Sequence, residues 1–304
     1  MPFLNGVEDE RTQPEAGSSS LLPECANPNC TSGWLHLWRR RRMPVIEGGW
    51  LCSPACTQTR VQELVNREFR GAMDAPGAHR HRIPLGLVLL SAGWITHEQL
   101  KKALQAQKAG AKERIGEWLV KHCGLEEQRV TQALSLQWNC PVFSRPTGHA
   151  GFRVSPVPRI FVETFGVLPL RLSATGILYI AFEDRVDHSL TLALERMTRL
   201  RVEAGLLGES DFHRHHQSVL SMPYPRARLM EARSARDMTG LLARLIEKEK
   251  PSETRMVRVH DFFWLRFWKS ENSRSEKNAP AGDDPRTGQA QDVICSVTTL
   301  DDTP

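Results

Sequence analysis

The sequence between Arg82 and Gln137 contains one pattern twice, about thirty residues apart and without a gap. The matching pairs are Leu85-Gly86 with Ile115-Gly116, Leu89 with Leu119, Ile95 with Leu125, Leu100 with Val130, Ala103 with Ala133, Leu104 with Leu134, and Gln107 with Gln137. In each copy, apolar residues recur at i, i+3 and i+4, which is the spacing of one helix face. Each copy is therefore predicted to form a short helix, a tight turn and a second helix.

Local signals agree with this tandem helical hairpin. Thr96, followed by Gln99, predicts a capping box at the second helix of copy one. A duplicated hairpin that only buries a shared core explains the leucines. Packing alone is a weaker explanation for Gly86 and Gly116, and for the glutamine at the end of each copy. These positions are therefore candidates for a function beyond packing.

The repeated pattern resembles a known motif: Arg-Leu-Gly, two spacers, an aliphatic residue, then Gly, Leu, Leu and Gln at fixed steps. It looks like the N-terminal domain of type II secretion and type IV pilus assembly ATPases, of the MshE N-terminal type. Copy two supplies Arg114, Gly116, Leu119, Val130, Leu134 and Gln137, and copy one supplies Leu85, Gly86, Leu89, Gly93, Leu100, Leu104 and Gln107. Two departures stand out. Pro84 replaces the arginine of copy one, with Arg82 two residues earlier, and Cys123 replaces the glycine of copy two, with Gly124 next.

The resemblance implies a ligand, because that family's domain is a receptor for cyclic di-GMP that uses two tandem motifs. An arginine can stack on a guanine and donate to its acceptor edge, and a glycine at a helix start admits a phosphate. A glutamine can bond a guanine edge or a phosphate. The implied ligand-binding residues are Arg82, Gly86, Leu89 and Gln107 in copy one, and Arg114, Gly116, Leu119 and Gln137 in copy two. Copy two is expected to be the better half-site.

Composition places few limits on this function. The chain has 304 residues, 40% of them hydrophobic and 25% charged, which allows about two modest domains. A net charge of +5 permits an anionic partner without requiring one. No run of about eighteen apolar residues predicts a membrane span, and the first twenty residues lack the pattern of a secretion signal. We therefore expect a cytoplasmic protein with a disordered lead at residues 1–20.

Four of the seven cysteines form two close pairs, Cys25 with Cys30 and Cys52 with Cys56. Two such pairs across a short gap can hold zinc in a tetrahedral thiolate site. The segment also predicts a hairpin turning at Gly48-Gly49 and a helix that begins at the second pair, so residues 21–70 resemble a treble-clef zinc module. The alternatives are uncoordinated thiols or a disulfide, which the cytosol disfavours. Four thiolates leave no position for water, so the expected zinc is structural.

Arg39 to Arg42 form a run of basic residues inside this module. With Trp34 and Trp38 beside it, the run could bind phosphates of a nucleic acid. A solvated hairpin edge has the same composition, because edge charges discourage strand pairing. We favour the solvated edge and do not expect nucleic acid as the partner.

The remaining chain predicts an α+β protein in several segments. After a linker at 71–81 and the tandem motif at 82–142, residues 143–224 are predicted to form a small α/β subdomain. Its expected strands are 141–143, 166–170, 176–182 and 201–205, and its helices lie within 156–165 and at 186–198 and 209–220. Residues 225–269 predict a helix at 237–249 and an aromatic strand at 256–268 that packs on the preceding domain. The polar residues 270–304 predict a disordered tail.

The sequence contains no GxxxxGK[ST] loop, no HExxH and no nucleophile elbow. An enzyme is therefore not expected, and two classes of function stay open. In the first, a regulatory adaptor binds cyclic di-GMP through 82–142 and acts on a protein partner of the secretion or pilus type. In the second, the helical domain only docks, and the zinc module binds a protein or nucleic acid. Gln107 and Gln137 favour the first class, whereas Pro84 and Cys123 favour the second.

Overall fold

The computed structural model describes residues 25–31, 43–73, 82–110, 112–144, 150–269 and 290–298. The expected lead at 1–20 and the arginine run at 39–42, with its two tryptophans, lie outside these ranges. The helices are α1 (Pro54–Met73), α2 (Leu85–Ser91), α3 (His97–Lys108), α4 (Ile115–Cys123), α5 (Glu127–Trp138), α6 (Arg159–Phe165), α7 (His188–Thr198), α8 (Glu209–Leu220) and α9 (Ala235–Glu249). The strands are β1 (Val45–Ile46), β2 (Gly49–Trp50), β3 (Leu168–Leu172), β4 (Ile177–Phe182), β5 (Arg201–Leu206), β6 (Arg226–Ala232), β7 (Glu253–Val259), β8 (Phe262–Trp268) and β9 (Ala290–Val297). The expected α+β class is confirmed.

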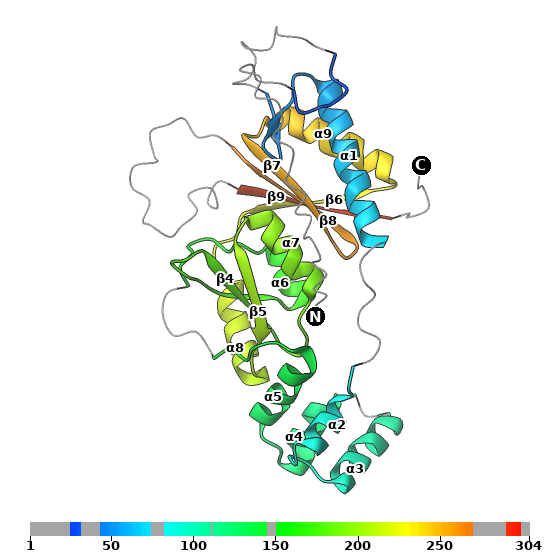
Figure 1. Ribbon diagram of the computed structural model, residues 1–304, viewed down its shortest axis with the longest axis vertical. Coiled ribbons are helices and arrows are strands. Elements are labelled where there is room, and N and C mark those ends of the chain that lie inside the picture. The colour runs from blue at the N-terminus through cyan, green and yellow to red at the C-terminus, as the bar shows by residue number, and fades with distance from the viewer. Residues whose placement is uncertain are drawn as a thin grey trace, which may run out of the picture.

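The doubled stretch folds as predicted, into the pairs α2–α3 and α4–α5 at one end of the molecule (Figure 1). Thr96 and Gln99 form the predicted capping box at the start of α3. The repeat has its own small core, in which equivalent residues of both copies are buried. Cys123 is accommodated because α4 runs two residues longer than α2, and Gly124 then takes the left-handed conformation (φ 68°) that Gly93 takes in copy one (φ 70°).

The middle of the chain forms a three-stranded sheet, in which β4 pairs antiparallel with β3 and parallel with β5. The predicted strands and helices of 166–220 are all present, with small shifts of their ends. Residues 141–143 do not form a full strand. They make a single parallel bridge, Val142 with Leu206, and the carbonyl of Pro141 lies so close to Gly205 that a side chain there would clash. This contact ties the exit of α5 to β5.

The far end of the molecule is a four-stranded sheet of order β6-β9-β8-β7. Two expectations are wrong here. The aromatic stretch 256–268 is two antiparallel strands rather than one, because the chain reverses at His260-Asp261, where His260 has a φ of 51°. The polar stretch 270–304 is not uniformly a disordered tail, because residues 290–297 form β9 between β6 and β8.

Both faces of this sheet are covered, so residues alternate between two cores. Phe263, Leu265 and Phe267 of β8 pack under α1 and α9, in one core with Met256 of β7 and Val293 of β9. Trp264 faces the other way, edge-on to Phe161 of α6 at 5.3 Å between ring centroids. The prediction that the aromatic segment packs on the preceding domain is thus confirmed.

The cysteine segment is part of this sheet unit rather than a module of its own. Helix α1 packs on α9, and the β1–β2 hairpin docks on β7 through backbone bonds such as Glu47 N to Thr254 O, at 2.8 Å. Buried residues of 46–65 and of 232–295 belong to one hydrophobic core. The expected separation of 21–70 from 225–269 is therefore corrected, and α1 extends to Met73, into the expected linker.

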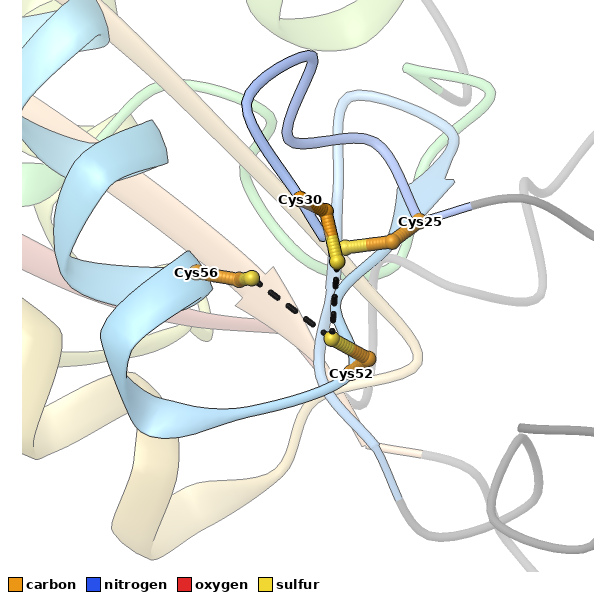
Figure 2. A group of neighbouring side chains, drawn as sticks. All are labelled: Cys25, Cys30, Cys52 and Cys56. Carbon is orange, nitrogen blue, oxygen red and sulfur yellow. Dashed lines mark hydrogen bonds between the residues drawn. The ribbon is translucent and has the colours of Figure 1, made fainter. Parts of the chain in front are cut away.

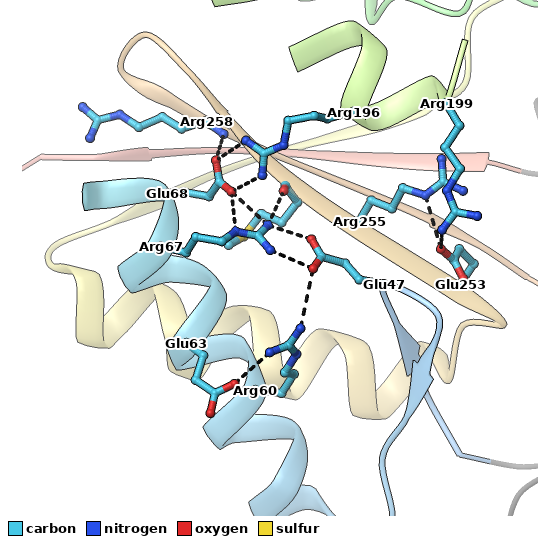
Figure 3. A network of polar contacts seen from close by, with 11 residues as sticks. Glu47, Arg60, Glu63, Arg67, Glu68, Arg196, Arg199, Glu253, Arg255 and Arg258 are labelled. Carbon is cyan, nitrogen blue, oxygen red and sulfur yellow. Dashed lines mark hydrogen bonds and ion pairs between the residues drawn. The ribbon is translucent and has the colours of Figure 1, made fainter. Parts of the chain in front are cut away.

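Two buried carboxylates are paired within this unit or at its border, and one of them joins the unit to the middle of the chain. Asp292 of β9 is fully buried and accepts from Arg266 Nε (2.6 Å), Arg266 Nη2 (2.8 Å) and Trp264 Nε1 (2.9 Å). Near β7, the buried Glu68 of α1 accepts from Arg196 of α7 at 2.6 Å and from the backbone of Arg258 of β7 at 3.0 Å (Figure 3). This contact joins α1 to α7 of the middle of the chain. Each buried carboxylate has a charged partner, as a buried charge requires.

Candidate functional site

Each copy of the repeat begins at an equivalent backbone position. Arg114 precedes α4 with φ −68° and ψ 154°, and Pro84 precedes α2 with φ −56° and ψ 140°. Residue 114 therefore stands at the N-cap of its helix with an extended backbone, which directs its side chain away from the helix axis. Proline fits the same position in copy one because its φ is fixed near this value.

The guanidinium of Arg114 is held by three carboxylates. It donates to Glu117 of its own helix at 2.5 Å, to Glu183 at 2.6 Å and to Asp184 at 2.8 Å. Glu183 and Asp184 directly follow β4, so they belong to the middle sheet. Burial opposes the positive charge, but the hydrogen bonds to Glu183 and Glu117 raise the pKa of Arg114, and it remains a cation.

These groups line a pocket of about 230 Å³ between the helical repeat and the middle sheet. Among the predicted residues, Arg114, Gly116 and Gln137 of copy two line it. Leu119 does not, because it is fully buried in the core of the repeat. The other lining residues are Leu85, Glu117, Val120, Glu127, Val130, Thr131, Leu134, Trp138, Glu183, Asp184, Arg185 and Glu209.

Two contacts of α5 shape the pocket. Gln137 donates from Nε2 to the carbonyl of Ile83, at 2.7 Å, and so holds the entry of α2 beside the pocket. Glu127, at the other end of α5, accepts from the backbone and the hydroxyl of Ser210 at 2.9 and 2.5 Å. The second helix of copy two is thus fixed against α8.

The predicted residues of copy one do not come together in a pocket of this kind. Gly86 and Leu89 are buried in the core of the repeat, and Gln107 is exposed near the end of α3. Arg82 lies instead at copy two, with its guanidinium carbon 3.0 Å from the centroid of the Trp138 ring. That copy two is the better half-site stays a prediction.

The two glycines have a packing role. A Cβ on Gly86 would lie 2.5 Å from Leu100 Cδ1, and one on Gly116 would lie 2.7 Å from Val130 Cγ1. The paired residues are themselves equivalent in the two copies. Both glycines therefore allow the first helix of a copy to lie close to the second, and a ligand is not needed to explain them.

Sequence reasoning missed the half of the pocket that comes from outside the repeat. Glu183, Asp184 and Arg185 form the loop between β4 and α7, and Glu209 begins α8. The run of three charged residues directly after a buried strand was a usable signal, because side chains at strand ends gather at a sheet edge. Ligand atoms of Glu183, Glu209 and His213 also lie within 4.8 Å of one another.

The second candidate site is formed by the four predicted cysteines, which the structure brings together (Figure 2). Cys30 Sγ and Cys56 Sγ lie 3.4 and 3.5 Å from Cys52 Sγ, and the four sulfur atoms lie within 4.8 Å of one another. Tetrahedral zinc with Zn–S bonds of about 2.3 Å requires sulfur atoms about 3.8 Å apart, whereas a disulfide requires about 2 Å. The cluster has the dimensions of a metal site.

The surroundings of the cysteines also suit a cation. Cys56 lies in the first turn of α1, so its sulfur is carried by the start of a well-packed helix. Burial, together with hydrogen bonds with Cys30 and Cys56, raises the pKa of Cys52 to about 12. Without a cation the Cys52 thiol therefore stays protonated at pH 7, and a bound metal would reverse that preference by coordinating the thiolate.

Comparisons with known proteins give a likeness of fold. No family model and no curated protein matches the sequence. A solved structure of MshE with cdg (cyclic di-GMP) is 25% identical, with a TM-score of 0.38, over 45% of this chain and 99% of that chain. The N-terminal domain of XpsE is 15% identical, with a TM-score of 0.31, over 44% of this chain and 91% of that chain.

None of the helices in the described ranges has the length and apolar character that a bilayer crossing demands. The likeness itself is to the MshE-type N-terminal domain, and it extends over somewhat less than half of this chain.

Proposed function

We propose that this chain is a non-catalytic regulatory adaptor whose pocket between α4, α5 and the β4–α7 loop binds cyclic di-GMP. The observation that carries the proposal is the pairing of Arg114 with Glu183 and Asp184 inside a pocket lined by the repeated motif. An arginine can donate to O6 and N7 of guanine, and carboxylates can accept from its N–H donors. The pocket therefore offers both kinds of partner that a guanine edge needs.

Apolar and planar groups support the same ligand. Leu85, Val130 and Leu134 line the pocket beside the flat ring of Trp138. Such surfaces cover the face of a purine, and an aromatic ring stacks on it. Adenine has an acceptor at N1 and no amino group at C2, where guanine has the N1–H and N2–H donors that Glu183 and Asp184 would bind, so the pocket should prefer guanine.

The test is a calorimetric titration of the full chain with cyclic di-GMP, with cyclic di-AMP as the matched control. Saturable heat with the guanine nucleotide and at least tenfold weaker binding of the adenine one are expected. If millimolar cyclic di-GMP gives neither a heat of binding nor a change in the protein's chemical shifts, the proposal is wrong.

The same proposal makes the chain a sensor without a motor. It is supported by the lack of a GxxxxGK[ST] loop among the 304 residues. We expect no ATP turnover, measured as phosphate release after stringent purification. Turnover that persists through purification and is lost on mutation of this chain would contradict a non-catalytic role.

One observation favours the alternative, in which the helical repeat is a docking unit without a nucleotide. Ile83, Leu87 and Leu136 of the repeat are 64%, 50% and 66% exposed. A protein partner of the secretion or pilus type would cover such side chains. The titration separates the two functions, because a docking unit gives no response to either nucleotide.

For the cysteine cluster we propose a structural zinc ion bound by Cys25, Cys30, Cys52 and Cys56. The short distances between the sulfur atoms favour it. Residues 25–31 also form neither a helix nor a strand, so a metal ion would be a main source of their order. Metal analysis of freshly reduced protein should give about one zinc per chain. Cys52→Ser should release the zinc and loosen 25–31, whereas α1 should persist because it packs on α9. Absence of zinc in the reduced protein would refute this proposal.

A further inference from the structure

The arginines in and beside the pocket differ in how they are paired. Arg114 already donates to three carboxylates. Arg185 also lines the pocket, and Arg82 stacks on Trp138, which lines it as well. Within the part of the chain that the structure describes, neither Arg82 nor Arg185 has a hydrogen bond or an ion pair.

Arg82 is held in an unfavourable state by this arrangement. Its guanidinium lies flat on Trp138, and its Nη1 atom is buried without a hydrogen-bond partner among the described residues. A buried donor of this kind is costly to leave unsatisfied. Burial lowers the pKa of Arg82, and the positive charge of Arg185 lowers it further. The two positive charges are thus close enough to repel each other, and neither has an ion pair with a carboxylate among the described residues.

The nearby acidic groups do not fill this role. Cys140 lies close to Arg82, but burial raises its pKa to about 11, so it is a neutral thiol at pH 7. Asp187 lies near Arg185, but its oxygens already accept from the backbone of Leu190 at 3.0 Å and contact His260 Nε2 at 2.5 Å. The missing partner of the two arginines is therefore an anion from outside these contacts.

We propose that Arg82 and Arg185 form a phosphate subsite beside Trp138 of the pocket. The proposal rests on the proposed function and assigns two parts of the ligand to residues. A phosphate of the ligand would bind at Arg82 and Arg185, and a guanine would bind at Arg114. Guanidinium groups bind phosphate oxygens through paired N–H donors, and Arg82 is pre-oriented by its stacking on Trp138. Arg82 then serves copy two, although it precedes copy one in the sequence.

The test compares binding of cyclic di-GMP to Arg82→Gln, to Arg185→Gln and to the matched control Arg159→Gln. Arg159 is exposed and pairs with Glu163 on α6, outside the pocket. Each pocket variant should bind about tenfold more weakly than the wild type, with less dependence on salt, and the control should bind unchanged. Arg82→Lys should fall between, because lysine keeps the charge but loses the stacking and the paired donors.

The outcomes separate this subsite from the proposed function. If the wild type binds cyclic di-GMP and both glutamine variants bind equally well, the subsite is wrong and the proposed function stands. If the wild type does not bind cyclic di-GMP, the proposed function is wrong, and inorganic pyrophosphate tests the subsite alone. Its addition should then shift the side-chain Nε–H signals of Arg82 and Arg185, assigned with the variants, but not that of Arg159. Unshifted Arg82 and Arg185 signals would overturn the subsite.

Discussion

The two copies of the helical repeat have nearly the same internal structure and different surroundings. Leu89 and Leu119 are both fully buried, and Ala103 and Ala133 likewise. Their outward positions differ: Leu104 of copy one is 42% exposed, whereas the equivalent Leu134 packs on the core of the middle sheet. Among the described residues, α5 of copy two contacts β5 and, through Glu127, Ser210 at the start of α8. Copy two also supplies most of the repeat residues that line the pocket, whereas copy one contributes Leu85.

This difference shows that the repeated motif builds a helical pair but not a pocket by itself. The pocket also needs the β4–α7 loop, whose Glu183 and Asp184 reach Arg114. Copy one has no such neighbour among the described residues, so its glutamine points to solvent. A motif match therefore indicates where a half-site can form, and the packing of the second helix determines whether it does.

The largest expected difference between the copies concerns position 114 and its equivalent, 84. Arg114→Ala should weaken binding of cyclic di-GMP by about 1.5–3 kcal/mol, the usual cost of a lost charge-assisted contact. Pro84→Arg should strengthen binding by about 1 kcal/mol, because residue 84 is exposed beside Leu85 of the pocket and has a similar backbone conformation. Calorimetry measures both, and Arg159→Ala is the control.

A response to Arg114→Ala together with none to Pro84→Arg would sharpen the contrast between the copies. Equal losses for Arg114→Ala and Arg159→Ala would instead show that the pocket arginine has no special role. Circular dichroism of each variant checks that α4 is retained when Arg114 no longer neutralises the three carboxylates.

The second contrast concerns the two glycines. Gly116→Ala should destabilise the repeat by about 1–2 kcal/mol, because its new methyl group meets Val130, a side chain that is stiff at χ1 in a helix. Gly86→Ala should be nearly neutral. The methyl there meets only the flexible end of Leu100, and alanine gains about 1 kcal/mol of helix propensity over glycine.

Chemical denaturation measures both changes in stability, and hydrogen exchange locates them within α2 to α5. Equal losses of stability in the Gly116→Ala and Gly86→Ala variants would contradict the packing difference between the two copies.

The smallest contrast concerns the closing glutamines. Gln137→Leu should reduce stability or ligand affinity by about 1 kcal/mol, since it removes the hydrogen bond to Ile83 and leaves that carbonyl unpaired. Gln107→Leu should change neither, because the Gln107 side chain is exposed and makes no hydrogen bond to any described residue. A loss of affinity with Gln107→Leu in calorimetry would mean that copy one also binds ligand.

The parts of this fold that the sequence predicts are those held by near neighbours in the chain. The helices of the repeat follow from their spacing of apolar residues, and the capping box at Thr96 from two residues three apart. Cys25, Cys30, Cys52 and Cys56 were also foreseen as a cluster, because short spacings limit how they can fold.

The parts that the sequence did not predict depend on distant partners. Strand β9 has polar residues close to both ends, and its Asp292 is of a residue type that is usually exposed to solvent. In the folded chain, Arg266 neutralises that carboxylate in the core and Trp264 donates to it, and these distant partners allow the strand to be buried. Glu183 and Asp184 were missed for the same reason: their partner Arg114 lies in another part of the sequence.

The position of β9 between β6 and β8 also has a consequence for how the chain is made. Translation produces α1 early, with Val61, Leu64 and Val65 on one side, but the surface that buries them comes from α9, β8 and β9. The helical repeat, with its local contacts, can fold while the rest is still being synthesised, whereas α1 must wait. During that interval the cysteine segment carries exposed apolar side chains. This is the stage at which nascent chains are most prone to aggregation and most dependent on chaperones.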